Sequence, residues 1–91
     1  MAFVPIGIDD YVTKFLAGNP GSKRSEVTTR LKETLAEFRA GARCSCGAPI
    51  WVIGSAEVGN ACFTCITGEA NPEEDYEIAE ACVPEGRLTR R

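Results

Sequence analysis

The sequence predicts an α+β fold, with two N-terminal helices followed by a β-hairpin module and a third short strand. Three observations lead to this prediction. Apolar residues recur at helical spacing before Gly41. Short apolar runs bounded by glycine follow it, as they do in hairpins. Two close cysteine pairs, Cys44 with Cys46 and Cys62 with Cys65, flank those runs.

The length of the chain, 91 residues, suits one small domain. A core of this size gives only marginal stability, so small domains commonly add a disulfide, a metal or a partner subunit. The proportions of hydrophobic residues, 44%, and charged residues, 25%, are those of a globular protein. We expect residues 1–42 to form a helical part, residues 43–82 to form the cysteine-containing part, and residues 83–91 to be a flexible tail.

The segment GIDDYVTKFLAGNPG is predicted to contain the first helix. Asp9 or Asp10 is the expected N-cap and Gly18 the expected end, because Pro20 prevents continuation. The apolar side chains of this segment form one short helical face, made of Tyr11, Val12, Phe15 and Leu16.

The segment SKRSEVTTRLKETLAEFRAG is predicted to form a second, longer helix. Its apolar positions are spaced by four, four and three residues and form one stripe: Val27, Leu31, Leu35 and Phe38. Ser22 or Ser25 is the expected N-cap, and Gly41 is the expected C′ residue in the left-handed conformation. We expect the stripe to pack on the first helix and on the cysteine module. Docking of this stripe on another protein is the alternative.

After Gly41 the helical spacing of apolar residues gives way to short apolar runs. Two apolar runs, at residues 50–53 and 58–63, are separated by glycine, serine and alanine and are predicted to pair as a hairpin. Residues 76–79 are predicted to form a third short strand, with a last helical turn as the alternative. The acidic residues around them lack the spacing of a calcium loop and are expected to be solvated: Glu73, Glu74, Asp75, Glu77 and Glu80.

The cysteine pairs have the spacing of a metal site. Two cysteines one or two residues apart form a tight knuckle, and Gly47 supplies the positive φ that such a turn needs. A hairpin would return the second pair to the side of the first, so that four thiolates surround one tetrahedral Zn²⁺. The sequence contains no histidine, so the site must be all-sulfur or nearly so. We therefore predict a structural zinc site at Cys44, Cys46, Cys62 and Cys65.

Other interpretations of the cysteines remain open at this point. Iron suits the same tetrahedral cage of four sulfurs. The Cys62/Cys65 dithiol can carry redox chemistry, although the strand–helix context of that motif is missing. Disulfides are disfavoured by the odd count of five cysteines and by the cytoplasmic location expected below. Cys82 is expected to be a buried small hydrophobic residue. The alternative is that Cys82 replaces Cys44 or Cys46 as a metal ligand.

Two knuckles joined by a hairpin and followed by a third strand resemble a zinc ribbon over about residues 43–80. The strings CSCGAPIWVIGSAEVG, CFTCITGEA and DYEI are also similar to small bacterial proteins with a CxCG…CxxC pattern. This resemblance supports the zinc-ribbon-like metal site and implies no reaction and no substrate. The chain departs from common zinc ribbons in its C-x-C knuckle and in the lack of basic residues around it.

Charge and composition narrow the function classes. Residues 1–43 carry seven Lys or Arg and five Asp or Glu, which makes this half slightly basic. Residues 44–91 carry three Lys or Arg and eight Asp or Glu, which makes the half with the cysteines acidic. An acidic cysteine module disfavours nucleic acid as the partner. A secretory signal and a bilayer-spanning apolar stretch are both missing, so we expect a cytoplasmic protein without membrane contact. With no histidine base, we expect a non-enzymatic protein-interaction module whose contact surfaces are the helical half and the region of Trp51.

Overall fold

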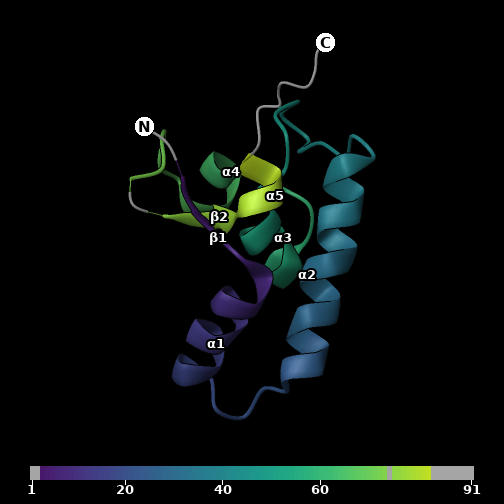
Figure 1. The fold of residues 1–91 in the computed structure, drawn as a ribbon. Coiled ribbons are helices and arrows are strands. Elements are labelled where there is room, and N and C mark those ends of the chain that lie inside the picture. The colour runs from purple at the N-terminus through teal and green to yellow at the C-terminus, as the bar shows by residue number, and fades with distance from the viewer. Residues whose placement is uncertain (1–2, 74, 83–91) are drawn as a thin grey trace.

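The computed structural model describes residues 3–73 and 75–82. Helices α1 (Ile8–Gly18) and α2 (Arg24–Arg39) lie side by side and run in opposite directions, joined by a short loop (Figure 1). They confirm the two predicted N-terminal helices, and α1 ends at Gly18 as expected. The predicted tail at residues 83–91 lies outside the described residues.

The start of α1 differs from the predicted cap. The carbonyl of Gly7 accepts a hydrogen bond from the N–H of Tyr11 at 2.9 Å, so Gly7 is the N-cap residue. Asp9 and Asp10 therefore lie in the first turn and make no side-chain cap. Their negative charges still stabilise the helix there, because the first turn is the positive end of the helix dipole.

The start of α2 also differs from the prediction, whereas its end agrees with it. Lys23 is the N-cap residue in place of Ser22 or Ser25, since its carbonyl accepts the first N–H bonds of the helix. The chain leaves α2 through Gly41, whose φ of +96° is the predicted left-handed conformation. The N–H of Gly41 bonds to the carbonyl of Phe38 at 3.1 Å, as in a Schellman-type C-cap.

The predicted hairpin is wrong. The residues expected to form its two strands, 50–53 and 58–63, instead lie in and around helices α3 (Val52–Val58) and α4 (Phe63–Thr67). The module is therefore helical where a zinc ribbon has its hairpin, and the resemblance in fold stops at the cysteine knuckles.

The reason for this difference lies outside the local sequence. Gly54 and Ser55, interpreted as a turn, are buried in the middle of α3. The N–H groups of Val52 and Ile53, at the start of that helix, donate to the Glu77 carboxylate at 2.8 and 3.2 Å. An acceptor so distant in sequence satisfies the free N–H groups of the helix end, and no local pattern reveals it.

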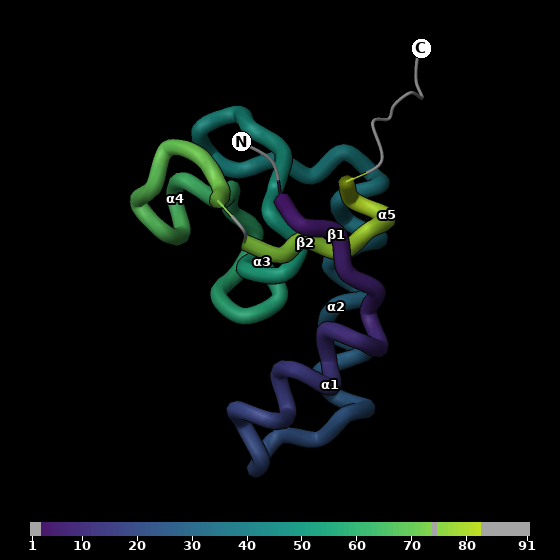
Figure 2. The backbone as a smooth tube through the Cα atoms, turned by 60° about the vertical axis from the view of Figure 1, so that its left-hand side comes forward, coloured from purple at the N-terminus to yellow at the C-terminus, as the bar shows by residue number. Residues whose placement is uncertain are grey.

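A small parallel sheet joins the two ends of the described chain (Figure 2). Strand β1 (Val4–Ile6) pairs with β2 (Tyr76–Ile78), with Ile6 opposite Ile78. Strand β2 confirms the predicted third strand, and α5 (Ala79–Cys82) supplies the helical turn that was the alternative. Strand β1 was not predicted. Helices together with this two-stranded sheet make the fold α+β.

The hydrophobic core draws on both halves of the chain. Val27, Leu31 and Leu35 of the predicted α2 stripe are buried, and Phe38 packs beside them. The other buried members are Ile6, Val12, Val52, Ile53 and Ile78. The helical half therefore packs on α3 and β2, as expected for the α2 stripe. No helix in the described part of the chain is both long and apolar enough to cross a bilayer.

Candidate metal centre

The first cysteine knuckle lies in the loop between α2 and α3. The N–H of Cys44 bonds to the carbonyl of Ala48 at 2.8 Å, and the N–H of Gly47 bonds to the carbonyl of Cys44 at 2.9 Å. These two bonds close a tight turn around Cys46. Gly47 has φ of +97°, so it takes the positive φ predicted for it, which suits a residue without Cβ.

The second knuckle is the start of helix α4. Cys62 is the N-cap residue of α4, and its Sγ accepts a hydrogen bond from the N–H of Cys65 at 3.4 Å. One helical turn therefore places Cys62 and Cys65 on the same side of the chain. The helix stops one residue before Gly68, which has the left-handed conformation at φ +82°.

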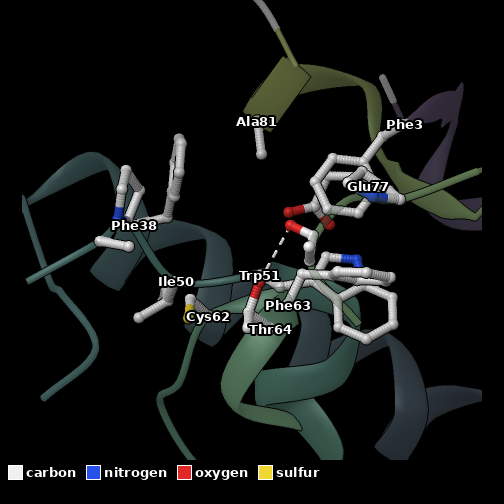
Figure 3. Close-up of a pocket in the computed structure, with 13 residues that line it drawn as sticks. Phe3, Phe38, Ile50, Trp51, Cys62, Phe63, Thr64, Glu77 and Ala81 are labelled. Carbon is white, nitrogen blue, oxygen red and sulfur yellow. Dashed lines mark hydrogen bonds between the residues drawn. The ribbon is translucent and has the colours of Figure 1, made fainter. Parts of the chain in front are cut away.

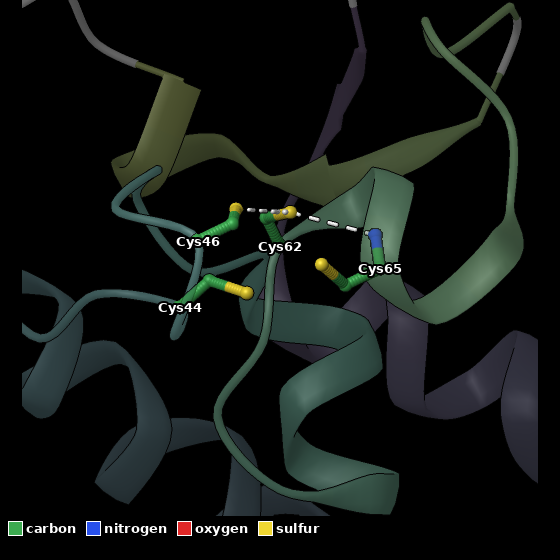
Figure 4. A group of neighbouring side chains, drawn as sticks. All are labelled: Cys44, Cys46, Cys62 and Cys65. Atoms are coloured by element: carbon green, nitrogen blue, oxygen red, sulfur yellow. Dashed lines mark hydrogen bonds between the residues drawn. The ribbon is translucent and has the colours of Figure 1, made fainter.

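The two knuckles converge although no hairpin joins them. The Sγ atoms of the four cysteines, Cys44, Cys46, Cys62 and Cys65, all lie within 4.8 Å of one another and point toward a common centre (Figure 4). Sγ of Cys46 lies 3.6 Å from Sγ of Cys62. A tetrahedral zinc site with Zn–S bonds of about 2.3 Å has sulfur–sulfur edges of about 3.8 Å. The cluster therefore has the dimensions and donor set to hold a metal ion.

The cluster lies at the edge of the molecule. Cys44 and Cys62 are buried, whereas Cys46 and Cys65 are exposed. All five cysteines of the chain are free thiols, so the disulfide interpretation is not supported. One buried and one exposed sulfur come from each knuckle, which leaves the centre reachable from solvent on one side.

The thiols of the cluster differ strongly in acidity. Hydrogen bonds from the backbone N–H groups of Cys46 and Cys62 lower the pKa of the Cys44 thiol to about 6. Hydrogen bonding to the sulfur of Cys44 raises the pKa of the Cys65 thiol to about 12. Without a cation, a first thiolate thus forms easily and further negative charge is disfavoured. A divalent cation removes that repulsion and displaces the shared protons.

Cys82 lies apart from this cluster. Its half-buried thiol is in α5, and its Sγ lies 3.9 Å from the carbonyl oxygen of Glu77. Burial raises the pKa of the Cys82 thiol above its ordinary value. The group of neighbouring sulfurs does not include it, so the structure gives no support for Cys82 as a ligand in exchange for Cys44 or Cys46.

Glu77 is the residue whose role the sequence did not reveal. Expected to be solvated with the other acids, it is only 3% exposed. Besides the two bonds from the start of α3, its Oε1 accepts a bond from its own neighbour Ile78 N–H at 2.9 Å. Its place in β2 gave no clue, because alternation with Tyr76 and Ile78 predicts an exposed Glu77, whereas Glu77 and Ile78 are both buried. Of the other acids, Glu74 lies outside the described residues.

Trp51 packs in an aromatic cluster beside the cysteines. Its ring stacks on Phe3 at 5.8 Å and meets the edge of Phe63 at 4.9 Å between centroids. Its Nε1–H donates to the carbonyl of Tyr76 at 2.9 Å. On its other side, Gly54 lies so close that a side chain there would overlap the indole ring. Trp51 is therefore partly buried, packed against the core and hydrogen-bonded.

The chain was compared with protein families, curated proteins and solved structures. No protein-family model, no curated protein and no solved structure matches the chain, so the interpretation of the cysteine cluster depends on its own geometry.

Proposed function

We propose that this protein binds one structural Zn²⁺ ion through Cys44, Cys46, Cys62 and Cys65, and that it serves as a non-enzymatic protein-interaction module. The observation that carries the proposal is the convergence of four Sγ atoms within 4.8 Å of one another. Four thiolate donors fill a tetrahedral zinc shell, and sites of this kind hold folds together and do not activate water.

The position of the cluster supports a stabilising role. One knuckle follows α2, and the other begins α4. A metal ion bound to both would cross-link two loops that only a few backbone hydrogen bonds otherwise hold. In such small domains the free energy of metal binding becomes free energy of folding.

Elemental analysis combined with native mass spectrometry of the purified protein tests the metal. We expect one zinc ion per chain, lost when Cys44 and Cys62 are both replaced by serine. A protein of full helical content that carries no metal, and that does not take up zinc on titration, would disprove the structural-zinc proposal.

Iron and dithiol chemistry are the second candidate function, favoured by one observation. Cys62 and Cys65 form a C-x-x-C pair at the start of helix α4, which is the spacing of redox-active dithiols. A ferric site with four thiolates absorbs visible light, whereas the zinc protein is colourless. A coloured protein, or one whose Cys62–Cys65 pair oxidises reversibly without losing zinc, would replace the structural proposal.

The partner is proposed to be a protein. The metal-loaded chain should be cross-linked in host cells and the captured proteins compared with those captured by a Cys62→Ser variant. We expect a partner that is retained only by the metal-loaded form. Binding to nucleic acid would instead weaken steeply as the salt concentration is raised. Salt-dependent binding of nucleic acid, together with no captured protein partner, would refute the proposed partner class.

A further inference from the structure

An apolar cavity of about 320 Å³ lies between the first knuckle, the start of α4 and strand β2 (Figure 3). Its volume is at the lower end of the range found for small-molecule sites, about 300–1,000 Å³. The buried residues Ile50, Cys62, Phe63 and Glu77 line it, and so do the exposed residues Pro49, Thr64 and Ala70. The buried residues mark the floor, and the exposed ones mark the mouth.

Aromatic rings form one wall of this cavity. Phe3, Trp51 and Phe63 all line it, with centroid separations of 5.8, 4.9 and 5.5 Å among the three pairs. Figure 3 shows these rings together on one side, with Phe38 across the cavity from them. The faces of aromatic rings carry negative electrostatic potential and attract cations.

Glu77 supplies the carboxyl group on the floor, which is ionised above its pKa of about 7. It is 3% exposed, and its carboxylate accepts three backbone N–H bonds, from Val52, Ile53 and Ile78. A carboxylate has about four lone-pair positions, so one acceptor position remains on Oε2. Lysine and arginine are missing from the described lining. The cavity therefore combines aromatic faces with one buried carboxylate and no counter-charge.

We propose that this cavity binds a small organic ammonium ion, with the cationic head against Phe3, Trp51 and Phe63 and near the Glu77 carboxylate. Aromatic walls and a nearby carboxylate attract such an ion together. The same groups repel anions. A neutral molecule of equal shape gains only from the apolar surface, so charge should decide the affinity.

This inference goes beyond the proposed zinc function and does not depend on it. The ammonium site is formed by aromatic rings and a carboxylate, whereas the metal site is formed by sulfur atoms. Cys62 lines the cavity and belongs to the cysteine cluster, so the experiment uses the protein as purified and measures its metal content in parallel. Failure of one proposal then leaves the other intact.

The test is run at about pH 8, where the Glu77 carboxyl is ionised, and compares two ligands of the same shape, choline and the neutral 3,3-dimethylbutan-1-ol. The chain contains a single tryptophan, Trp51, which lines the cavity, so its fluorescence reports binding directly. Calorimetry gives the affinities. We expect saturable binding of choline, with roughly tenfold weaker binding of the alcohol, from the usual strength of cation–π contacts in partly dry sites. Equal affinities, preference for the alcohol, or binding of neither would overturn the proposal.

A matched pair of variants tests the aromatic wall. Phe3→Leu keeps an apolar side chain and removes one ring face from the cavity. Phe15→Leu is the control, because Phe15 packs beside Tyr11 on α1 and does not line the cavity. We expect Phe3→Leu to weaken choline binding at least about threefold and to leave the affinity for the alcohol unchanged. Phe15→Leu should change neither of the two affinities. Unchanged choline binding in a folded Phe3→Leu protein would refute the aromatic assignment.

The carboxylate is tested by Glu77→Gln, with folding checked by circular dichroism. We expect this variant to lose the preference for choline over the alcohol. Should Glu77→Gln fail to fold, the ligand pair and the Phe3→Leu variant still decide the proposal, because neither depends on removing the carboxylate.

Discussion

The carboxylate of Glu77 in β2 accepts a 2.8 Å hydrogen bond from the backbone N–H of Val52, the first residue of α3. The same group bonds to the N–H of Ile53. One side chain thereby attaches the sheet to the helix that replaced the expected hairpin. The consequences of this contact can be measured directly.

At about pH 5, below the pH range in which Glu77 loses most of its contribution, replacing Glu77 by Gln should lower the free energy of unfolding by about 1–3 kcal/mol, because an amide offers one acceptor oxygen to N–H groups that are buried. Glu80→Gln is the control, since Glu80 is exposed on the neighbouring helix α5. Denaturant unfolding followed by circular dichroism measures both. Equal stability of Glu77→Gln and Glu80→Gln would show that the carboxylate does not hold α3.

Glu77 should also make stability depend on pH. Burial raises the pKa of its carboxyl group from 4.5 to about 7. Between these values the folded state binds a proton that the unfolded state has lost, so stability falls as the pH rises, by up to ~1.4 kcal/mol per pH unit. The total loss is about 3 kcal/mol and is complete above the folded-state pKa.

The comparison with Glu77→Gln isolates this effect from the titration of the cysteines. With saturating metal present, the difference in unfolding free energy between wild type and Glu77→Gln should decline from about pH 4.5 to about pH 7.5 and then level off. A difference that is constant with pH, or one that grows as the pH rises, would contradict the assignment.

Gly54 should not tolerate a side chain. A Cβ atom at this position would lie 2.5 Å from Cε3 of Trp51 and 2.8 Å from Cδ1 of Ile66. Gly54→Ala should therefore destabilise the protein by about 1–3 kcal/mol through overpacking, with a change in Trp51 fluorescence. Gly18→Ala is the control, since nothing lies within 4 Å of its Cβ position. A Gly54→Ala protein as stable as Gly18→Ala would disprove this packing argument.

Replacing a cysteine of the cluster and replacing Cys82 should have different effects on zinc affinity. Cys62→Ser, which removes a buried member of the cluster, should lower zinc affinity strongly and should lower the thermal midpoint of the metal-loaded protein. Cys82→Ser should keep one metal ion per chain, because Cys82 lies outside the cluster. Zinc titration with a competing chelator measures both affinities. A large loss of affinity in Cys82→Ser would show that Cys82 is a ligand.

The α2 stripe should carry a large part of the core stability. Leu31 is 1% exposed, so Leu31→Ala should cost about 2–5 kcal/mol of unfolding free energy. Val58, at the end of α3, is 69% exposed, and Val58→Ala should change stability by less than about 0.5 kcal/mol. Thermal and denaturant unfolding give these values, and similar costs at the two positions would refute the buried stripe.

The helical half was predictable because its signals are local. The spacing of Val27, Leu31 and Leu35 defines one face of a helix, and all three are buried. Gly41 ends α2 with a positive φ because that position needs a residue without Cβ. The caps at Gly7 and Lys23 were missed because their backbone carbonyls, and not polar side chains, start the helices.

The sequence by itself determined the α1–α2 pair, the tight turn at Gly47 and the two cysteine knuckles, since each depends on residues a few positions apart. Only the tertiary structure decided how the knuckles meet. Residues 52–58 are a helix because Glu77 caps them from β2, and β2 in turn pairs with β1 at the other end of the described chain. These contacts join segments far apart in sequence, and no periodicity or spacing encodes them. The same long-range packing formed the aromatic cavity beside the cysteine cluster.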